Sequence, residues 1–227
     1  MEKEKKQQNK KITRARVFDF RYLLYDIGRI IAAPSWFLWF RPKWKFESDL
    51  AKKKIRGGAV LSFNHTGILD PARDQFAVWY RRMHFVAAVE LSKTPFSKWI
   101  FANFFHCIAV DRTNFNLGTF REITDHLVAG NVISIYPEGH VNVSEEGLNA
   151  FKSGVVMMAI RSGRPIVPIY SMTPKKWYKR TVYCIGEPID VRTRLGAMPS
   201  IDAIQQFSEF LREKETQLRK IAEGDRT

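Results

Sequence analysis

Hydrophobic and polar positions follow two different patterns along the chain, and the pattern changes near residue 55. Over residues 17–40, apolar residues recur every three or four positions, which is the spacing of one face of an α-helix. Beyond residue 55, short apolar or β-branched runs alternate with longer amphipathic runs. The short runs predict strands over 59–63, 85–89, 107–110, 132–136, 166–170 and 182–185. The longer runs predict helices over 71–82, 95–103, 117–129, 149–162 and 201–222.

This alternation predicts the fold class. Strands that alternate with helices favour an α/β fold, here a mixed sheet flanked by helices, with an N-terminal amphipathic helical element in front of it. Gly130 and Gly163 follow two of the predicted helices, and glycine is a typical residue just beyond a helix end.

The first 45 residues divide into two parts by charge. Residues 1–16 contain seven Lys or Arg and two Glu, which predicts a basic disordered arm rather than a signal peptide. In residues 17–45, the longest uncharged run, from 30 to 40, has only 11 residues. A helix that spans a bilayer needs about 20 apolar residues. A simple transmembrane helix is therefore not expected, and Pro34 should break or kink the helix.

The apolar stripe within residues 17–45 ends in aromatic residues, and cations follow them. The stripe is Phe20, Leu23, Leu24, Ile27, Ile30 and Ile31, the aromatic residues are Trp36, Phe37, Trp39 and Phe40, and the cations are Arg41, Lys43 and Lys45. Tryptophan prefers the level of the lipid head groups, and cations favour anionic lipid. We interpret this part as an amphipathic, membrane-associating segment. The alternative is a helix that packs on the protein's own core.

Composition narrows the class of protein. The chain has 227 residues, of which 45% are hydrophobic, which excludes a disordered chain and predicts a single domain over 46–227 after the two N-terminal parts. Its two cysteines, Cys107 and Cys184, cannot hold a chain of this length together as disulfides, so we expect buried thiols. The formal net charge of +14 indicates an anionic partner, either nucleic acid or an anionic membrane surface.

Candidate chemistry begins where the first predicted strand ends, in the sequence SFNHTGILDP over residues 62–71. His65 can take a proton near neutral pH, and the carboxylate of Asp70 can orient its imidazole. On a continuous helix, five residues correspond to a rotation of about 140°, so His65 must lie in the turn and the helix must begin near Asp70 and Pro71. The alternative is that Asp70 only caps the helix.

Three further stretches place polar residues at strand ends. Asp111 and Arg112 follow one strand, where an arginine suits phosphate or carboxylate, although a surface salt bridge is the alternative. Glu138 lies in a Pro-Glu-Gly turn after another strand, which is also explained by turn chemistry alone. Residues 151–172 give the pattern helix, turn, strand, whose apolar run is typical of a core.

In their order, these stretches resemble the glycerolipid acyltransferase family, whose best-known members are 1-acyl-glycerol-3-phosphate acyltransferases. The motifs are NHxxxxD, a strand ending in DR, a strand ending in PEG, and FKxG followed by PIVPI, and the resemblance covers residues 55–190. Residues 46–227 are then the acyltransferase domain. The resemblance implies that His65 is a general base oriented by Asp70. It also implies an acceptor site that includes Asn64, Arg112, Glu138 and Gly139, with residues 166–169 in the substrate cavity.

The resemblance implies a reaction and a set of partners. A fatty acyl group passes from acyl-CoA or acyl carrier protein to the free hydroxyl of 1-acyl-glycerol-3-phosphate, which gives phosphatidic acid. The chain has no GxSxG motif, so an acyl-enzyme is not indicated, and we expect no metal and no resident cofactor. The expected partners are an anionic membrane surface, the lyso-lipid and the acyl donor, but not nucleic acid. The expected location is peripheral or monotopic on the cytoplasmic face of a membrane.

Two stretches depart from the family pattern. The third motif reads YPEGHVN where FPEGTRS is usual, so that His140 and Val141 replace a threonine and an arginine, and Ala88 and Val89 stand where a lysine is common. One alternative is therefore O-acylation of a different lyso-lipid or of an amino-lipid. An alternative of another class is a non-catalytic protein that binds lipid or nucleic acid.

Overall fold

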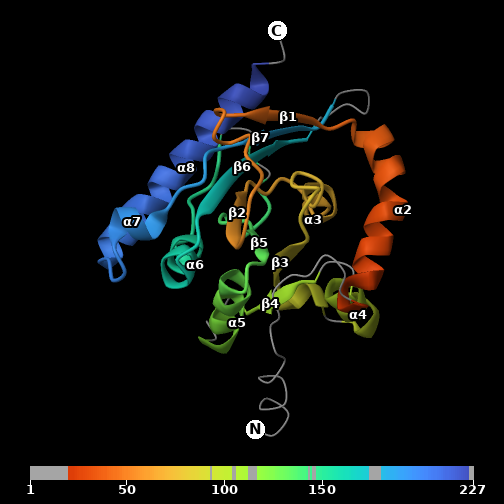
Figure 1. The fold of residues 1–227 in the computed structure, drawn as a ribbon, viewed down its shortest axis with the longest axis horizontal. Coiled ribbons are helices and arrows are strands. Elements are labelled where there is room, and N and C mark those ends of the chain that lie inside the picture. Colours follow the sequence, from red (N-terminus) through yellow and green to blue (C-terminus); the bar gives the residue numbers. More distant parts are fainter. Residues whose placement is uncertain are drawn as a thin grey trace, which may run out of the picture.

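The computed structural model describes residues 20–92, 94–103, 106–111, 117–142, 144, 147–173 and 180–224. Within these residues, seven strands form one sheet in the order β1-β7-β6-β2-β5-β3-β4 (Figure 1). The strands are β1 (Lys43–Phe46), β2 (Ala59–Phe63), β3 (Met83–Ala88), β4 (Ile108–Val110), β5 (Val132–Ile135), β6 (Ile166–Met172) and β7 (Val182–Ile185). Neighbouring strands are parallel except for β6 and β7, which are antiparallel. The mixed sheet predicted from the sequence is confirmed.

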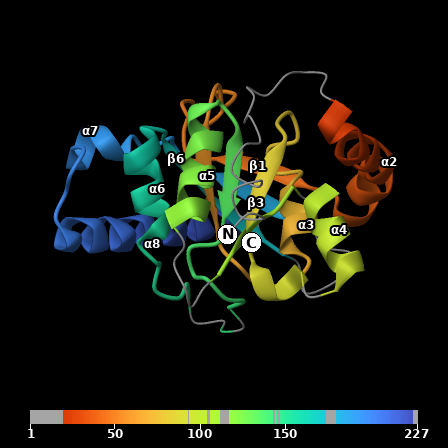
Figure 2. The ribbon, with the colours of Figure 1, turned by 90° about the horizontal axis from the view of Figure 1, so that it is seen from below.

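Helices cover both faces of this sheet. They are η1 (Phe20–Tyr22), α2 (Leu23–Phe40), α3 (Asp70–Asp74), η2 (Val89–Ser92), α4 (Pro95–Asn103), α5 (Leu117–Val128), α6 (Gly154–Ser162), α7 (Val191–Leu195) and α8 (Ile201–Glu223). The two ribbon views agree that α5, α6, α7 and α8 lie to one side of the sheet, and α2, α3 and α4 to the other (Figures 1 and 2).

The core has two layers because side chains alternate along each strand. On β2, Val60 faces the layer formed with α5, α6 and α8, whereas Leu61 and Phe63 face the layer that includes the segment after α3. Every residue of β2 is buried, as is typical of a central parallel strand covered on both faces. The residues that follow β2 are therefore held rigidly at the carboxyl edge of the sheet.

The structure corrects several element predictions. The pattern does not predict β1 or α7, and β1 contains residues 43–45, which the sequence analysis places in the N-terminal segment. Its sequence KWKF contains two lysines and so lacks the apolar run that marks the other strands, yet Trp44 and Phe46 pack on the apolar layer beside α3. Helix α3 ends at Asp74 instead of residue 82, and α6 begins at Gly154 instead of 149. Helix α2 does not end at Pro34 but continues to Phe40.

Helix α2 docks on the protein through its polar and ring-bearing face. Tyr25 is 1% exposed, Asp26 forms an ion pair with Arg82 at 2.5 Å, and Arg29 donates to backbone carbonyls near residue 80. The apolar stripe points away from the protein, since Phe20, Ile30 and Ile31 are 92%, 72% and 72% exposed. Within the described ranges, no helix combines the length and the apolar character that crossing a membrane requires.

Candidate active site

The strand β2 delivers Asn64 and His65 to the carboxyl edge of the sheet. The amide side chain of Asn64 pairs with the backbone of Ser171, accepting from its N–H at 2.7 Å and donating to its carbonyl at 3.1 Å. These bonds extend the β2–β6 pairing beyond its last backbone pair, Phe63 with Ile169. Asn64 is fully buried and fixes the point at which the chain leaves the sheet.

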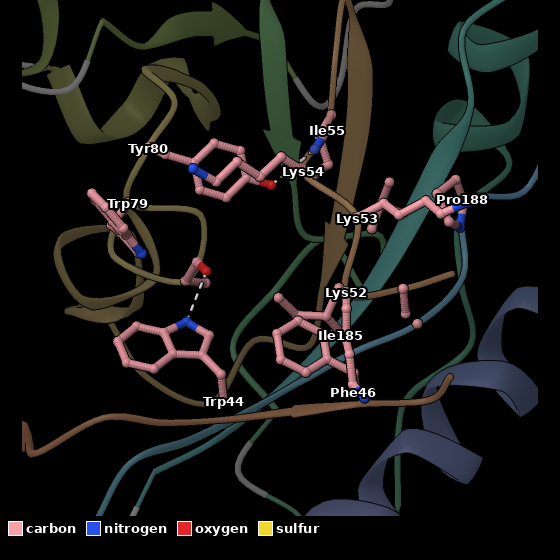
Figure 3. Close-up of a pocket in the computed structure, with 14 residues that line it drawn as sticks. Trp44, Phe46, Lys52, Lys53, Lys54, Ile55, Trp79, Tyr80, Ile185 and Pro188 are labelled. Atoms are coloured by element: carbon pink, nitrogen blue, oxygen red, sulfur yellow. Dashed lines mark hydrogen bonds between the residues drawn. The ribbon is translucent and has the colours of Figure 1, made fainter. Parts of the chain in front are cut away.

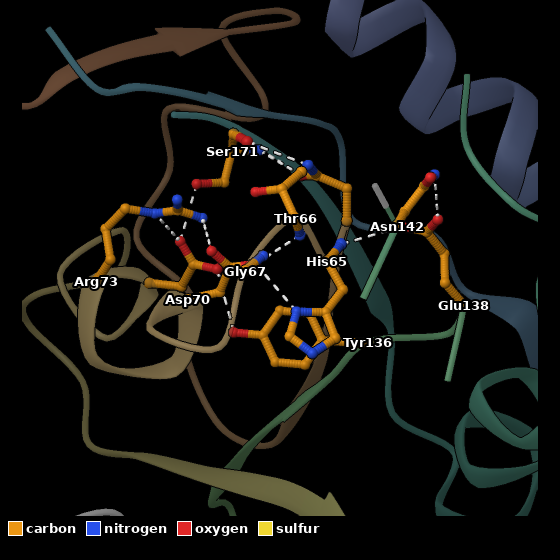
Figure 4. Close-up of polar contacts among 11 residues, drawn as sticks. His65, Thr66, Gly67, Asp70, Arg73, Tyr136, Glu138, Asn142 and Ser171 are labelled. Atoms are coloured by element: carbon orange, nitrogen blue, oxygen red, sulfur yellow. Dashed lines mark hydrogen bonds and ion pairs between the residues drawn. The ribbon is translucent and has the colours of Figure 1, made fainter. Parts of the chain in front are cut away.

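His65 and Asp70 meet as the motif predicts (Figure 4). The Nδ1 atom of His65 lies 3.0 Å from Oδ2 of Asp70. The same oxygen accepts hydrogen bonds from the backbone N–H groups of Thr66 at 2.6 Å and Gly67 at 2.8 Å. These residues precede helix α3, so Asp70 closes the loop around His65 and does not cap the helix that begins with it.

Two further charged residues, Arg73 and Asp74, lie next to Asp70 on the side away from His65, and the sequence analysis did not select them. Arg73, one turn further along α3, lies 3.0 Å from Oδ1 of Asp70, and its Nε donates to Asp74 at 2.9 Å. Asp74 also accepts from the hydroxyls of Ser171 at 2.8 Å and Tyr136 at 3.2 Å. The spacing of three residues between Asp70 and Arg73 was the available signal, because such residues share a helix face.

Tyr136 contacts both His65 and Asp74. Its ring stacks on the imidazole of His65, with centroids 4.2 Å apart and an interplanar angle of 21°, and its hydroxyl reaches Asp74. Phenylalanine is usual at this position of the motif and would supply the ring but not the hydroxyl. Burial, followed by the charges of Asp74 and Asp70, raises the pKa of Tyr136 well above its ordinary value, so the phenol keeps its proton and donates.

The electrostatics of the site favour an ionised Asp70. Burial alone raises the pKa of an aspartate, but the hydrogen bond from His65, the charge of Arg73 and two backbone amides outweigh it. The pKa of Asp70 is therefore below its ordinary value. An ionised Asp70 accepts from Nδ1–H of His65, which assigns the proton to Nδ1 and leaves Nε2 as the proton-accepting nitrogen. The His65 side chain is 14% exposed, so solvent reaches it.

Glu138 links the loop of His65 to the segment of Asn142 and Asn149 by hydrogen bonds. Its Oε1 accepts from the backbone N–H of His65 at 3.0 Å, and its Oε2 accepts from Asn142 at 2.8 Å and from the N–H of Asn149 at 2.9 Å. Asn142 in turn donates its backbone N–H to the carbonyl of His65 at 2.7 Å. Glu138 is 1% exposed, so its carboxylate is engaged inside the protein.

Gly139 occupies a position that favours glycine, because its backbone lies in the left-handed region. Its φ is +76°, and a Cβ placed there would lie 2.7 Å from Cε and 2.8 Å from Nζ of Lys152. The Pro-Glu-Gly turn and the exposed side chain of Lys152 therefore touch beside the site. Sequence reasoning did not select Lys152, although it belongs to the fourth motif.

The remaining predicted residues divide into three groups. Arg112 lies outside the described residues, whereas Asp111, just before it, lies at the end of β4. Residues 166–169 form the first half of β6, where Ile166, Val167 and Ile169 are buried in the core. At the departures from the family pattern, Val141 and Val89 are exposed, and His140 lies 3.4 Å from the amide of Asn149.

The order of motifs and the geometry of the site define an acyltransferase. A family model described as acyltransferase matches residues 45–172, which is more than half of the chain, so the protein belongs to this family and is an acyltransferase enzyme. The predicted resemblance is thereby confirmed.

Among solved structures, the chain is similar to the 1-acyl-sn-glycerophosphate (LPA) acyltransferase PlsC from Thermotoga maritima. The TM-score is 0.59 and the sequence identity is 20%, over 88% of this chain and 80% of that one. At this identity the likeness shows the α/β fold, as predicted. No curated protein sequence matches the chain.

Proposed function

We propose that this enzyme transfers a fatty acyl group from acyl-CoA or acyl carrier protein to the free hydroxyl of 1-acyl-glycerol-3-phosphate, which gives phosphatidic acid. The observation that carries the proposal is the His65–Asp70 pair, which leaves Nε2 of a solvent-accessible imidazole as a proton acceptor. An alcohol has a high pKa, so its attack on a thioester needs such a base close by.

In the proposed reaction, Nε2 of His65 takes the proton of the acceptor hydroxyl as its oxygen attacks the thioester carbonyl. The tetrahedral intermediate then collapses, the thiolate leaves, and the imidazolium returns the proton to the sulfur. Asp70 stabilises the imidazolium without taking the proton, because Arg73 and two backbone amides hold it ionised. The reaction uses no resident cofactor, since the acyl donor is a substrate.

Two cations support a phosphate-bearing acceptor. The ammonium of Lys152 lies beside the Pro-Glu-Gly turn, close to the loop of His65. Arg112 is the second candidate, on the strength of the family resemblance. The exposed valines Val89 and Val141, where cations are usual, instead favour our second candidate function, which is O-acylation of another lyso-lipid or of an amino-lipid.

We further propose that α2 lies in the interface of an anionic membrane, as part of a peripheral or monotopic protein on the cytoplasmic face. A helix that docks through its polar face and exposes its apolar stripe has the polarity expected at a lipid surface. The same surface would present the lyso-lipid to the site. This docking combines both interpretations of the segment, since one face contacts the protein and the other is left for lipid.

Acyl transfer in liposomes tests the reaction. Labelled acyl-CoA and acyl carrier protein are offered against a panel of lyso-lipids, and we expect transfer to 1-acyl-glycerol-3-phosphate. His65→Ala should lower kcat by about 10²- to 10⁴-fold, which is the usual contribution of a general base. The matched control is His140→Ala, because His140 is exposed beside the same turn and should leave kcat nearly unchanged.

The outcomes separate the candidates. Wild-type rates in His65→Ala would exclude the base assignment. Transfer that depends on His65 but goes only to another lyso-lipid would retain the chemistry and favour the second candidate. No transfer to any member of the panel would contradict both.

A further inference from the structure

A cavity of about 280 Å³ opens on the face of the sheet that carries α3 (Figure 3). Phe46, Val167 and Ile185 line it from three neighbouring strands, and the rings of Trp44, Trp79 and Tyr80 line it as well. An apolar ligand that enters a cavity with this lining is stabilised, because its apolar surface is removed from water. Its volume is near the lower end for small-molecule sites, roughly 300 Å³. It therefore suits one hydrocarbon chain and not a two-chain lipid.

The cavity is separate from the active site. On β6, Val167 lines the cavity, Ile169 follows on the same face and is fully buried, and Ser171, two residues further, contacts Asp74. Four residues of a strand span about 13 Å. On β7, Ile185 lines the cavity, whereas the fully buried Tyr183 reaches the backbone of Arg73. Packed side chains thus fill the space between the cavity and His65.

Three consecutive exposed lysines, Lys52, Lys53 and Lys54, also line the cavity. Lys52 pairs with Asp49 at 2.6 Å, and Nζ of Lys54 lies 5.6 Å from the centre of the Tyr80 ring. In the part of the chain that the structure describes, no carboxylate lies within ion-pair distance of Lys53 or Lys54. Two cations without carboxylate partners beside an apolar cavity favour an anionic group at its mouth and disfavour a cationic one.

We propose that this cavity binds a single-chain amphiphile with an anionic head group, such as a long-chain carboxylate. The chain lies against Phe46, Val167 and Ile185, and the head group lies at the mouth of the cavity between Lys54, which extends towards Tyr80, and Lys53, which extends towards Pro188 (Figure 3). This is a second lipid-binding site, which does not depend on the reaction proposed for His65. Because packed side chains separate the two, its occupant leaves the catalytic pair accessible.

The test uses the full chain without membranes and titrates it with ω-bromoundecanoate below its micellar concentration. Bromine quenches indole fluorescence at close range. The chain has six tryptophans, so the part of the quenching that Trp79→Phe removes reports a chain in the cavity. We expect saturable quenching, weaker affinity for the neutral ω-bromoundecanol, and loss of much of the saturable signal in Trp79→Phe. Full quenching in Trp79→Phe would place the chain elsewhere and overturn the proposal.

Paired lysine variants test the head group. Lys53→Gln/Lys54→Gln should raise the Kd of the carboxylate about five-fold, the size expected for two partly exposed ion pairs. The control, Lys98→Gln/Lys220→Gln, removes the same charge from exposed positions outside the cavity and should change Kd less than about two-fold. Equal effects of the two pairs, equal affinity for acid and alcohol, or tighter binding of the matching trimethylammonium would overturn the proposal.

Discussion

The corner of the candidate active site, formed by His65, Asp70, Arg73 and Asp74, and the N-terminal helix α2 both reverse the usual distribution of side chains, but in opposite directions. At the corner, the ionisable residues Asp70, Arg73 and Asp74 are at most 3% exposed. On α2, Ile30 and Ile31 are apolar and 72% exposed. The corner compensates for its burial internally, since each charge has a partner of opposite sign. The side chains of the apolar stripe, in contrast, are left 43–92% exposed by the described residues.

This difference separates two kinds of functional feature. A buried charge network costs free energy unless every member is paired, and it holds its members in one geometry. An exposed apolar stripe costs little in the folded protein but lowers the free energy when another apolar phase covers it. Substitutions in the buried charge network should therefore lower the free energy of unfolding, and substitutions in the apolar stripe should weaken binding.

Breaking the corner should give the largest effect. Arg73→Met leaves the carboxylates of Asp70 and Asp74 buried without their cation, which should lower the free energy of unfolding by about 3–5 kcal/mol. For a chain of this size, that corresponds to a fall of Tm by about 6–20 °C in thermal unfolding followed by circular dichroism.

The matched control for Arg73 is Arg121→Met. Arg121 also pairs with an aspartate, Asp125, at 3.9 Å, but both side chains are exposed. Removing this surface pair should cost less than about 0.5 kcal/mol. If Arg73→Met unfolds within the range of the control, the buried network does not stabilise the corner.

Changing the stripe of α2 should affect binding and not folding. Ile30→Ser/Ile31→Ser removes two side chains that are each 72% exposed, so Tm should stay within about 2 °C. Partial burial of two isoleucines in lipid is lost, so partitioning onto vesicles of anionic lipid should fall about 10- to 100-fold in a flotation assay. The control, Leu117→Ser/Met198→Ser, replaces residues that are 75% and 97% exposed on α5 and after α7, and it should float like the wild type. Equal losses in both variants would exclude α2 as the specific membrane contact.

The sequence predicted most of the fold because apolar runs of strands and the apolar periodicity of helices can be recognised directly in the chain. Strands β2 and β7 and helix α4 have the predicted bounds. The misses are short elements whose stability comes from distant partners. Strand β1 has four residues and pairs with β7, some 140 positions later in the chain, and α7 has five residues. Strand β7 also has four residues, but its sequence VYCI is one apolar run, whereas two of the four residues of β1 are lysines.

The site could be predicted as far as its motif extends. His65 and Asp70 lie together, as their spacing and the family resemblance indicated. Arg73 shares a helix face with Asp70, so its spacing gave a local signal, but the role of Asp74 depends on Ser171 and Tyr136, which only tertiary contacts bring to it. Such contacts have no local signal in one sequence. The roles of Asn64, Glu138, Gly139 and Arg112 in binding an acceptor stay predictions.

Glu215 on α8 is another buried ionisable residue, and the pH dependence of Tm tests what its burial costs. Its side chain is fully buried, hydrogen-bonded to Ser62 at 2.5 Å, and burial raises its pKa well above the ordinary value of 4.5. A pKa raised on folding gives stability that is complete below about pH 4.5 and is lost as pH rises toward the folded pKa. Glu215→Gln should therefore unfold at a higher Tm than the wild type at pH 8, and its Tm should depend less on pH between 5 and 8.

The control for Glu215 is Glu213→Gln, an exposed glutamate on the same helix. Its substitution should leave the pH dependence of Tm unchanged. A wild-type slope in Glu215→Gln would show that this carboxyl does not change its pKa on folding.

The hydroxyl of Tyr136 provides the finest test of the corner, because Tyr183 offers a matched hydrogen bond. Tyr136 donates to the carboxylate of Asp74 at 3.2 Å, and Tyr183 donates to the backbone carbonyl of Arg73 at 2.9 Å, both within the buried core.

A hydrogen bond to a charged group contributes about 1.5–3 kcal/mol and one between neutral groups about 0.5–1.5 kcal/mol. Burial raises the pKa of Asp74, whereas the charge of Arg73, whose Nε lies at 2.9 Å, lowers it, and we expect Asp74 to be ionised because of this ion pair. Tyr136→Phe should therefore cost about 1 kcal/mol more than Tyr183→Phe, or 2–4 °C in Tm, while the ring that stacks on His65 keeps kcat within about three-fold. Equal losses of Tm would mean that Asp74 is neutral, and the negative charge of the corner would then reside on Asp70 alone.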